Sequence, residues 1–577
     1  MPLPTEETSA VTPLALILPE GALALAVECD GEAGRALFHP GDQRLTVAAP
    51  PQGRGALWLS AGDVHGALAA VAEAMMAEVE PRSPMRGPLW GWMSWDELRF
   101  GLCERDVLEN AEIMARRLGV GDAIVLLDDG WQRAAGDWEP NERFGRGLPW
   151  LTDRIHALGL RAGLWIAPFS VAICSEMAHA HGDWLLRSGA DGEPLVDLDF
   201  PQWGGRTGTL DPTRPEVIDW LHALGQRLAG WGFDYVKMDF LFHALTGVAS
   251  DPSQSRTAAY RRAIGAIRAG LGSDVITMGC GTPLVPGRGL FDAARIGDDV
   301  VTDWSLMRTR MTAAALRHCL HRRWWRCDPD NVVLRDPLTV DQGRAWATTV
   351  AMTGGSVFLG DDLRRLDSER WDIARRIWPP VDIDSRPLRL DTSPADAERP
   401  IGDGWIAEVH RPWGRCWVAA LVNWEATCRV SGVRWSELGI SEGTPCHVWE
   451  LWAERSMGVH RDEITVELSP TSCQVLVITP AADHPQVVGF TRHVLSGAVG
   501  LESVRWDASE RTLSGTVSRP LPESAPRLAI AVPRGWRLDT PQGLSAESVG
   551  ETDVAVLTVE RVGEWSLSFT ACPEEAP

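Results

Sequence analysis

The sequence predicts an α/β protein built around a (β/α)8, or TIM, barrel, with a small N-terminal β region before it and antiparallel β-sandwich domains after it. Between about residues 86 and 380, short apolar runs alternate with segments of helical periodicity, the pattern of βα units around a parallel sheet. The runs that read as strands are 90–95, 123–129, 161–168, 234–240, 275–281, 293–299, 331–336 and 356–362. Eight such units over roughly 300 residues suit this barrel, whose active site lies at the carboxyl ends of the strands.

The segments between these runs carry apolar residues at helical spacing and end near glycine or a basic cluster. The clearest helices are expected at Glu104–Leu118, 215–229, Arg256–Leu271 and 307–322. The fifth and sixth strand runs are too close together for a full helix between them. Residues 169–211 form a long insertion that begins at the catalytic rim, where it is in position to cap the pocket.

The chain divides into four predicted units where the type of element changes. After about residue 385 strand-like runs dominate, and residues 481–485 look like a linker. The first 80 residues are mainly β and lead into a helix at Val64–Ala77. The predicted units are a small β region at 1–85, the catalytic barrel at 86–384, an antiparallel β-sandwich at 385–482 and a second β domain at 483–577.

The composition indicates a globular protein and leaves a neutral substrate open. The net charge of −23 argues against a nucleic acid or an anionic membrane as partner, because phosphate binding draws on clustered Lys and Arg. No basic segment opens the chain as in a signal peptide, and no apolar run reaches the length of a membrane span. The 11 cysteines are scattered without metal-ligand spacing. We therefore expect a cytoplasmic protein with reduced thiols and no metal or cofactor, and its oligomeric state is left open.

A single lysine, Lys237, stands out because every other member of the 55 lysine and arginine residues is arginine. It lies in a strand-like run, where Tyr235, Lys237 and Asp239 share one face. An ammonium is a compact point charge and a guanidinium is a wide planar fork, so a site that needs one small donor beside a carboxylate cannot use arginine. The alternative is a buried structural ion pair.

Acidic residues end five of the eight expected strands. They are Asp128, Asp129, Asp239, Asp298, Asp299, Asp336, Asp361 and Asp362. Carboxylates crowded at a barrel mouth indicate either glycoside chemistry or a divalent metal, and the absence of histidine at these strand ends disfavours a metal. Tryptophans accompany them, namely Trp90, Trp92, Trp95, Trp131, Trp138, Trp165 and Trp304, and such rings suit the faces of a sugar. The alternatives are core packing for the tryptophans and helix capping for the carboxylates.

At these motifs the chain resembles the melibiase-type α-galactosidases of glycoside hydrolase family 36, in the retaining clan that includes family 27. The motifs are Asp128-Asp129-Gly130-Trp131-Gln132, Gly136-Asp137-Trp138, Gly163-Leu164-Trp165, Leu210-Asp211-Pro212, Asp234-Tyr235-Val236-Lys237-Met238-Asp239, Gly279-Cys280-Gly281 and Asp328-Pro329-Asp330. The resemblance covers roughly residues 86–480. The chain departs from better-known members at Ala167-Pro168-Phe169, where they carry glutamates, and at Thr282-Pro283-Leu284, where they have a glycine-rich loop.

The resemblance implies a role for each matched residue. Asp239 would be the nucleophile, kept ionised by Lys237, and Asp298 the acid/base, with Asp299 as the second choice. Lys237 would contact the sugar at O3 and O4, Asp128 and Asp129 would hold O4 and O6, and Cys280 would meet O2. Arg295 would support O2 or tune Asp298. Trp95, Trp131 and Trp165 would complete the substrate site.

Three functions are compatible with this pattern. The first is a retaining α-glycosidase, expected to be an α-galactosidase that hydrolyses terminal α-galactosides of small oligosaccharides by double displacement. The second is a raffinose-synthase-like α-glycosyltransferase, which passes the glycosyl group to a sugar hydroxyl, or a glycosidase for another sugar. The third, a non-catalytic sugar-binding barrel, predicts that one of the two carboxylates is missing, and both Asp239 and Asp298 are present.

Overall fold

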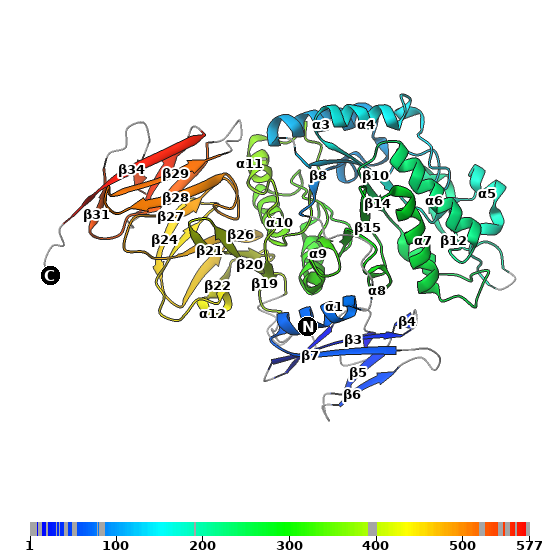
Figure 1. The fold of residues 1–577 in the computed structure, drawn as a ribbon, viewed down its shortest axis with the longest axis horizontal. Helices are drawn as coiled ribbons and strands as arrows, with labels where there is room; N and C mark the ends of the chain where they lie inside the picture. The colour runs from blue at the N-terminus through cyan, green and yellow to red at the C-terminus, as the bar shows by residue number, and fades with distance from the viewer. Residues whose placement is uncertain are drawn as a thin grey trace.

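We describe the protein from a computed structural model. The part of the chain that the structure describes comprises residues 87–119, 121–189, 192–390, 401–518, 525–539, 554–559 and 562–572, with strand β32 at Ala546–Ser548 and, before residue 87, strands β1 to β6, residues 55–77 and residue 79. No helix in this part is long and apolar enough to cross a membrane. Figure 1 shows a barrel flanked by β domains on one side and a small sheet below.

The centre of the molecule is a sheet of eight parallel strands, which confirms the predicted barrel. In chain order they are β8 (Trp90–Met93), β9 (Ile124–Leu127), β10 (Arg161–Ile166), β14 (Tyr235–Met238), β15 (Ile276–Gly279), β16 (Ala293–Arg295), β17 (Arg326–Asp328) and β18 (Val357–Leu359). They lie in the order β17-β16-β15-β14-β10-β9-β8-β18. A parallel bridge from Val332 to Leu359 brings the two ends of this sheet together.

The seventh strand was predicted in the wrong place. It is β17 and not 331–336, of which Val332 alone makes a bridge to the sheet. Two features make β17 hard to recognise in the sequence. It has only 3 residues, and it begins with the charged Arg326. The Arg326 guanidinium donates two hydrogen bonds, of 2.6 and 2.9 Å, to the Asp382 carboxylate. The apolar side chains after β17 are buried in the core, and apart from Val332 they do not join the sheet, so their pattern resembles that of a strand.

Helices surround the barrel much as the periodicity predicts. The longer ones are α3 (Glu104–Leu118), α4 (Leu148–Ala157), α6 (Pro215–Gly230), α7 (Arg256–Leu271), α9 (Trp304–Arg317), α10 (Val340–Met352) and α11 (Ser368–Arg376). Only the four-residue α8 (Leu284–Gly287) separates β15 from β16, as their spacing predicts. Helix α9 starts earlier than expected because Asp303 caps it, accepting from the Ser305 N–H at 3.0 Å.

Helices α6 and α7 pack side by side on the outer face (Figure 1). Two glycines permit their close approach. A Cβ on Gly225 would lie 2.3 Å from the Ile267 carbonyl oxygen, and one on Gly270 would lie 2.1 Å from that of His222. The pair therefore depends on backbone contact that any larger residue would block.

The long insertion forms a small layer beside the barrel mouth. It contains β11 (Ser170–Ala172), β12 (Val196–Phe200) and β13 (Gly205–Thr209) in an antiparallel sheet of order β11-β13-β12, with helix α5 (Glu176–Ala180). Phe200 and Trp203 of this layer line the cavity described below. The insertion thus contributes one wall of the pocket.

Two β units follow the barrel (Figure 1). The first is a six-stranded sheet and a two-stranded pair made by β19 (Ser385–Pro387), β20 (Gly404–Arg411), β21 (Gly414–Asn423), β26 (Ser472–Pro480), β23 (Cys446–Glu450), β24 (Arg455–His460), β22 (Arg429–Arg434) and β25 (Glu463–Leu468). The second is a pair of four-stranded sheets made by β27 (Gln486–Phe490), β30 (Arg527–Ala531), β33 (Val554–Thr558), β32, β28 (Leu501–Asp507), β29 (Thr512–Val517), β34 (Gly563–Ala571) and β31 (Trp536–Leu538).

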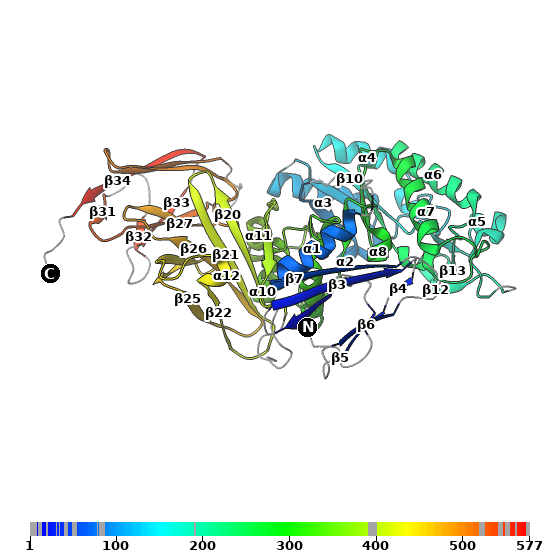
Figure 2. The same ribbon diagram turned by 60° about the horizontal axis from the view of Figure 1, so that its bottom comes forward.

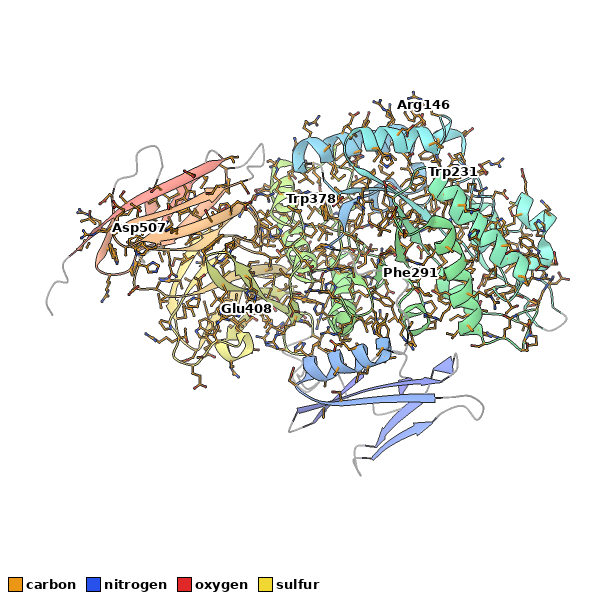
Figure 3. All side chains as sticks on the ribbon, in the orientation of Figure 1. Arg146, Trp231, Phe291, Trp378, Glu408 and Asp507 are labelled. Atoms are coloured by element: carbon orange, nitrogen blue, oxygen red, sulfur yellow. The ribbon has the colours of Figure 1, made fainter. Side chains whose placement is uncertain are left out.

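The last β unit is anchored to the barrel by Arg492. Its Nη1 donates to the carbonyl oxygens of Arg375 at 2.8 Å and Trp378 at 2.9 Å, and Trp378 lies where the barrel meets the C-terminal domains (Figure 3). Carbonyls at a helix end are ready acceptors for a guanidinium. This contact joins the end of α11 to the second β unit.

Before residue 87, the residues that the structure describes form a β layer and helix α1. They comprise β1 (Thr8–Ser9), β2 (Leu14–Leu18), β3 (Gly21–Cys29), β4 (Glu32–Ala33), β5 (Arg35–His39), β6 (Arg44–Ala48), β7 (Gly55–Gly62) and α1 (Val64–Ala77). Helix α1 lies between this layer and the barrel (Figure 2). Trp324 Nε1 donates to the Ala72 carbonyl at 2.8 Å, which fixes α1 against the barrel.

Candidate active site

A cavity of about 460 Å³ opens at the carboxyl ends of the barrel strands. Nine of the ten predicted site residues line it: Trp95, Asp128, Asp129, Trp165, Lys237, Asp239, Cys280, Arg295 and Asp298. They follow or end six different strands, so the barrel closure is what brings them together.

The tenth residue, Trp131, lies behind the wall. Its side chain is fully buried, and its Nε1 donates to the Trp165 carbonyl at 2.8 Å. Its ring packs on Trp138 and Trp231, with centroids 6.2 and 6.1 Å away. The prediction that Trp131 contacts substrate is therefore corrected, because the turn after Gly130 directs its ring into the core, where it supports the end of β10.

Lys237 pairs with Asp128 across the sheet. Its Nζ lies 2.9 Å from Asp128 Oδ2 and 3.5 Å from Met93 Sδ, and the lysine and aspartate side chains are 4% and 2% exposed. Burial lowers the pKa of Lys237, but the charge of Asp128, together with Cys280 and Asp239, outweighs burial and raises the pKa well above its ordinary value. The expected pairing with Asp239 is thus replaced by one with Asp128, since β10 alone separates β14 from β9.

Asp128 and Asp129 are buried carboxyls with defined partners. Burial raises the pKa of Asp128, although Lys237 opposes the rise. Burial also raises the pKa of Asp129 to about 7, even though it accepts from Gln132 Nε2 at 2.6 Å and Trp203 Nε1 at 2.8 Å. Desolvation outweighs hydrogen bonding at both positions.

Asp239 follows directly after β14, and both of its oxygens are held. Oδ2 accepts from Trp165 Nε1 at 3.1 Å, and Oδ1 accepts from the backbone N–H of Phe240 at 2.7 Å. Phe240 has a φ of 56°, a left-handed conformation that side-chain-bearing residues rarely adopt. The carboxylate is therefore fixed in direction, a common property of reacting groups.

Arg295 is the last residue of β16, and its guanidinium lies close to three carboxylates. Its nitrogens lie 3.0 Å from Asp299, 2.5 Å from Asp330 and 3.9 Å from Asp328. Burial alone would raise the pKa of Asp299, but Arg295, Lys237 and Arg99 lower it below the ordinary value. For Asp330, burial prevails over Arg295 and raises the pKa to about 6.

Comparison with known proteins agrees with this geometry. The melibiase family model matches residues 91–269, the stretch that contains β8 to β14 and the residues from Asp128 to Asp239. The α-galactosidase AgaA of Geobacillus stearothermophilus is 31% identical over 188 residues, which are 30% of this chain and 24% of AgaA. The match thus spans about a quarter of that relative's length.

Solved structures extend the likeness. An α-galactosidase from Thermus thermophilus in complex with p-nitrophenyl α-D-galactopyranoside has a TM-score of 0.55 and 28% identity, covering 68% of this chain and 78% of that one. The same enzyme in complex with stachyose has a TM-score of 0.52 and 30% identity, covering 62% and 77%. This chain belongs to the melibiase-type α-galactosidase family. A family 27 β-L-arabinopyranosidase from Geobacillus stearothermophilus, 19% identical with a TM-score of 0.54, shares the fold.

After the end of β16, the adjacent Asp298 and Asp299 differ in their surroundings. Both side chains are exposed, and both line the cavity. Burial raises the pKa of the Cys280 thiol, and the charges of Asp239 and Asp299 raise it further. Asp298 has no hydrogen bond or ion pair to any residue that the structure describes. Asp299 is therefore the carboxylate that interacts electrostatically with the groups around Asp239.

The sequence interpretation missed several residues of this cavity. Those that line it without having been predicted are Phe100, Phe200, Trp203, Phe240, Gly281, Gly297, Asp299 as a first choice, and Arg310. Trp203 matters most, because it donates to Asp129 and packs on Phe240 with centroids 4.9 Å apart. The one signal for it was the length of the insertion, which does not identify the residue that turns inward.

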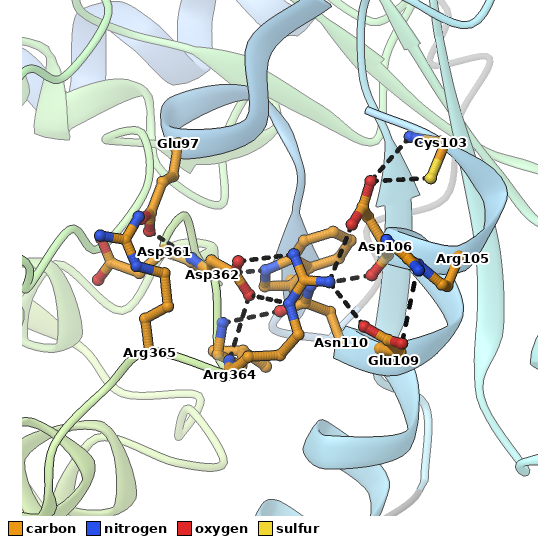
Figure 4. A network of polar contacts seen from close by, with 12 residues as sticks. Glu97, Cys103, Arg105, Asp106, Glu109, Asn110, Asp361, Asp362, Arg364 and Arg365 are labelled. Atoms are coloured by element: carbon orange, nitrogen blue, oxygen red, sulfur yellow. Dashed lines mark hydrogen bonds and ion pairs between the residues drawn. The ribbon is translucent and has the colours of Figure 1, made fainter. Parts of the chain in front are cut away.

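Three of the acidic strand ends have structural roles outside the cavity. Asp361 accepts from Arg335 Nη1 at 2.8 Å, and Asp336 accepts from Arg370 Nη2 at 2.7 Å. Asp362 accepts from Arg364, which also reaches two acidic residues of α3 (Figure 4). This network ties the loop after β18 to α3, so these carboxylates stabilise the barrel rim.

Proposed function

We propose that the protein is an α-galactosidase that hydrolyses terminal α-galactosides of small oligosaccharides with retention of configuration. The observation that carries the proposal is the fixed Asp239 carboxylate facing the same cavity as a second carboxylate after β16. Two carboxylates about 5 to 5.5 Å apart suffice for double displacement at a glycosidic bond. Family membership and the aromatic walls of the cavity support galactose as the sugar.

In this mechanism Asp239 attacks the anomeric carbon while a protonated carboxyl donates its proton to the glycosidic oxygen. The C–O bond to the leaving group breaks, and a covalent glycosyl-enzyme forms on Asp239. The second carboxyl, now ionised, then takes a proton from water, which attacks the same carbon and frees Asp239. The two inversions give a product with the α configuration of the substrate.

For the acid/base we favour Asp299 over Asp298, the first choice from the sequence. Asp299 shares its electrostatic surroundings with Lys237 and Cys280, which support the sugar side of the cavity. Arg295 lowers the pKa of Asp299 in the empty cavity, so the acid form is present at low pH and activity is expected to fall as pH rises. Asp298 remains the alternative, because it is exposed to the same space.

The remaining cavity residues have proposed roles in binding the sugar. Asp128 and Lys237 form one compact unit that offers both an acceptor and a donor to O3, O4 and O6, together with Asp129. Cys280 and Arg295 lie on the side of O2. Trp95 and Trp165 provide apolar surface for the sugar ring.

The experiment follows the configuration of the product. Proton NMR of the first galactose released from a nitrophenyl α-galactoside should show the α anomer before mutarotation. An initial β anomer means an inverting enzyme, whose carboxylates lie about 6.5 to 9.5 Å apart, and overturns the proposed pair. A panel of nitrophenyl α-glycosides, with and without acceptor sugars, identifies the sugar and separates hydrolysis from transfer.

We also propose a cytoplasmic location. The ten cysteines that the structure describes are all free, and seven of them are buried or half-buried. Free thiols in this number are typical of reducing compartments. Fractionation of native cells, with activity found in a periplasmic or secreted fraction, would contradict the proposal.

A further inference from the structure

We propose that a second cavity, where the chain passes from the barrel into the first β unit, binds a neutral sugar. This junction cavity encloses about 390 Å³. It is lined by residues 381–386, residues 406–410 of β20, Trp417 of β21, Leu438 of α12 (Trp435–Leu438) and Ala498. It shares no lining residue with the active-site cavity at the barrel mouth, so the inference does not depend on the proposed function.

The edge of β20 is open at the junction cavity. Strand β19 begins at Ser385, which lies opposite Ala407 of β20. Strand β20 continues from Glu408 to Arg411, and no strand that the structure describes pairs with this part on the β19 side. Residues 381–384 do not extend the pairing, and they and β20 form opposite walls of the cavity.

Two buried polar side chains of the junction cavity lack a hydrogen-bond partner. Ser385 is 3% exposed and Trp417 is 4% exposed. Neither Ser385 Oγ nor Trp417 Nε1 has a partner among the residues that the structure describes. Buried polar atoms nearly always have a partner in protein or water, so these two need one from the cavity that their residues line. The hydroxyl groups of a ligand can supply it.

Both residues lie on elements that are fixed in place. His318, at the end of α9, has its Nε2 2.6 Å from the Ser385 carbonyl oxygen. Burial lowers the pKa of His318 to about 4, so at neutral pH the ring is uncharged and its Nε2–H donates to this carbonyl. Trp417 lies opposite Glu408 in the β20–β21 register, and the Arg415 guanidinium lies 5.2 Å from its ring centroid.

Two of the three carboxylates that line the junction cavity are paired with arginine. Asp382 accepts from Arg326 Nη1 and Nη2 at 2.6 and 2.9 Å. Glu408, labelled in Figure 3 on the first β unit, lies 3.2 Å from Arg415 Nη1. These two carboxylates are therefore already balanced by positive charge, and they create no demand for a cation.

The third carboxylate, Asp384, and the guanidinium of Arg386 flank Ser385 and have opposite charges. Neither makes an ion pair with a residue that the structure describes, although Arg386 Nη2 donates to the Glu437 carbonyl oxygen. An anion in the cavity would be repelled by Asp384, and a cation by Arg386. A neutral ligand with hydroxyl groups can donate to Asp384 and accept from Arg386.

A sugar combines the properties that the junction cavity selects. Its hydroxyls both donate and accept, and its C–H face is apolar. Apolar side chains line the cavity beside the polar ones, namely Ile383, Ile406, Val409 and Leu438. The volume falls within the range of about 300 to 1,000 Å³ that small-molecule sites occupy. We therefore assign the site to a hexose or a disaccharide.

The test compares D-galactose with D-galacturonate and D-galactosamine, which place a negative or a positive charge on the same ring. Hydrogen–deuterium exchange of the full chain should slow at residues 404–411 and 383–388 when galactose is added, in addition to any change at 235–240 in the active-site cavity. The half-maximal concentration at 404–411 should be roughly 3- to 10-fold higher for each charged analogue.

Two substitutions remove the unpartnered donors. Ser385→Ala and Trp417→Phe should each raise the half-maximal galactose concentration at 404–411 roughly 3- to 10-fold, because each deletes one hydrogen bond to the ligand. The response at 235–240 should not change. Asp384→Asn changes an exposed side chain, so it leaves the core intact, and it should bring the galacturonate value at 404–411 closer to that of galactose.

The matched controls are Ser431→Ala and Trp449→Phe. Ser431 Oγ and Trp449 Nε1 are also buried without a partner among the described residues, but neither residue lines the junction cavity. Both controls should keep the wild-type response at 404–411. A response that weakens equally in the controls and in the test variants would reflect loosening of the β unit and would overturn the assignment.

The position of the protected peptides separates this inference from the proposed function. Slower exchange confined to 235–240 would mean that water alone fills the junction cavity, and it would overturn the inference while the α-galactosidase proposal stands. An equal response at 404–411 to all three ligands would overturn the selection of a neutral sugar. Galactose-dependent protection at 404–411 in a protein that hydrolyses no α-galactoside would support the inference and remove the proposed function.

Discussion

The two sides of the cavity balance charge in different ways. On the β9 and β14 side, one compact ammonium faces one carboxylate, Lys237 with Asp128, and both are almost fully buried. On the β16 side, one guanidinium serves three carboxylates, Arg295 with Asp299, Asp328 and Asp330. A fork with several donors can be shared, whereas a point charge at the end of a stem serves one close partner.

We propose that this difference separates sugar binding from proton transfer. On the β9 and β14 side, here called the paired side, Lys237 and Asp128 are buried and their charges are fixed in position, which suits recognition of neutral hydroxyls. On the β16 side, here called the shared side, the pKa values of two carboxyls move in opposite directions. The pKa of Asp299 is lowered, and that of Asp330 is raised to about 6. Groups whose environments push their pKa values apart are typical of acid–base sites. Asp239 lies between the two sides, held by Trp165 and its own neighbour.

The largest effect is expected from removing the group between the two sides. Asp239→Gly should fold normally and lose at least about 1000-fold in kcat, because the covalent route disappears. Added azide should restore turnover and yield the β-galactosyl azide, since the small anion attacks from the vacated side. Asp336→Asn, which changes an acidic residue outside the cavity, is the matched control. Activity like wild type in pure Asp239→Gly would remove Asp239 from the mechanism.

The second prediction decides between the adjacent carboxyls on the shared side. Asp299→Asn should lower kcat/KM for melibiose by about 100- to 10,000-fold and that for α-galactosyl fluoride much less, because fluoride leaves without a proton. Asp298→Asn should lower the melibiose value far less, because this prediction gives Asp298 no part in proton transfer. Kinetics of both variants on both substrates check this. The reverse pattern would restore Asp298 as the acid/base.

Much of the barrel was predictable from local patterns. Helices α3 and α7 agree with the predicted bounds to the residue, because each combines an apolar stripe with a glycine directly after its last turn. Strand β17 was missed because three residues with an arginine at their start carry no strand signal. Secondary structure is readable where the element is long enough to show its period.

The site was predictable as a set of strand ends but not as a set of contacts. The alternation of side chains along β14 correctly predicts that Lys237 faces the cavity. Its partner Asp128 follows β9, two strands away in the sheet. Trp203 reaches Asp129 from the insertion, across 74 positions in sequence. These partners are brought together by the closure of the barrel and by the fold of a loop. Neither can be predicted from a local sequence pattern.

The third prediction concerns Lys237→Arg, which places a guanidinium opposite Asp128 so that both sides of the cavity contain an arginine. Lys237→Arg keeps the charge, but the larger planar group cannot reproduce a single 2.9 Å contact in a space sized for an ammonium. Loss of one charge-assisted hydrogen bond costs about 1.5 to 3 kcal/mol, or roughly 10- to 150-fold in kcat/KM. A thermal melt and kinetics on the same sample test it. Unaltered kinetics, or activity and Tm falling together, would mean that Lys237 is structural.

The smallest effect is expected from removing one of the three carboxylates that surround Arg295 on the shared side. At neutral pH, Asp330, with a pKa of about 6, is mostly ionised and offsets part of the Arg295 charge. Asp330→Asn removes that negative charge, so the field of Arg295 falls more fully on Asp299 and lowers the pKa of Asp299 further. The proton donor exists only below this pKa. The alkaline limb of the kcat/KM profile should therefore move to lower pH, by about one unit.

Two features make this pH shift specific to the charge of Asp330. Asp330→Glu keeps the charge and should leave the limb near its wild-type position even if a longer side chain lowers kcat. A packing defect in Asp330→Asn would lower activity at every pH without moving the limb. A shift to higher pH would mean that Arg295 does not set the pKa of the proton donor, and that the shared guanidinium orients Asp299 without tuning it.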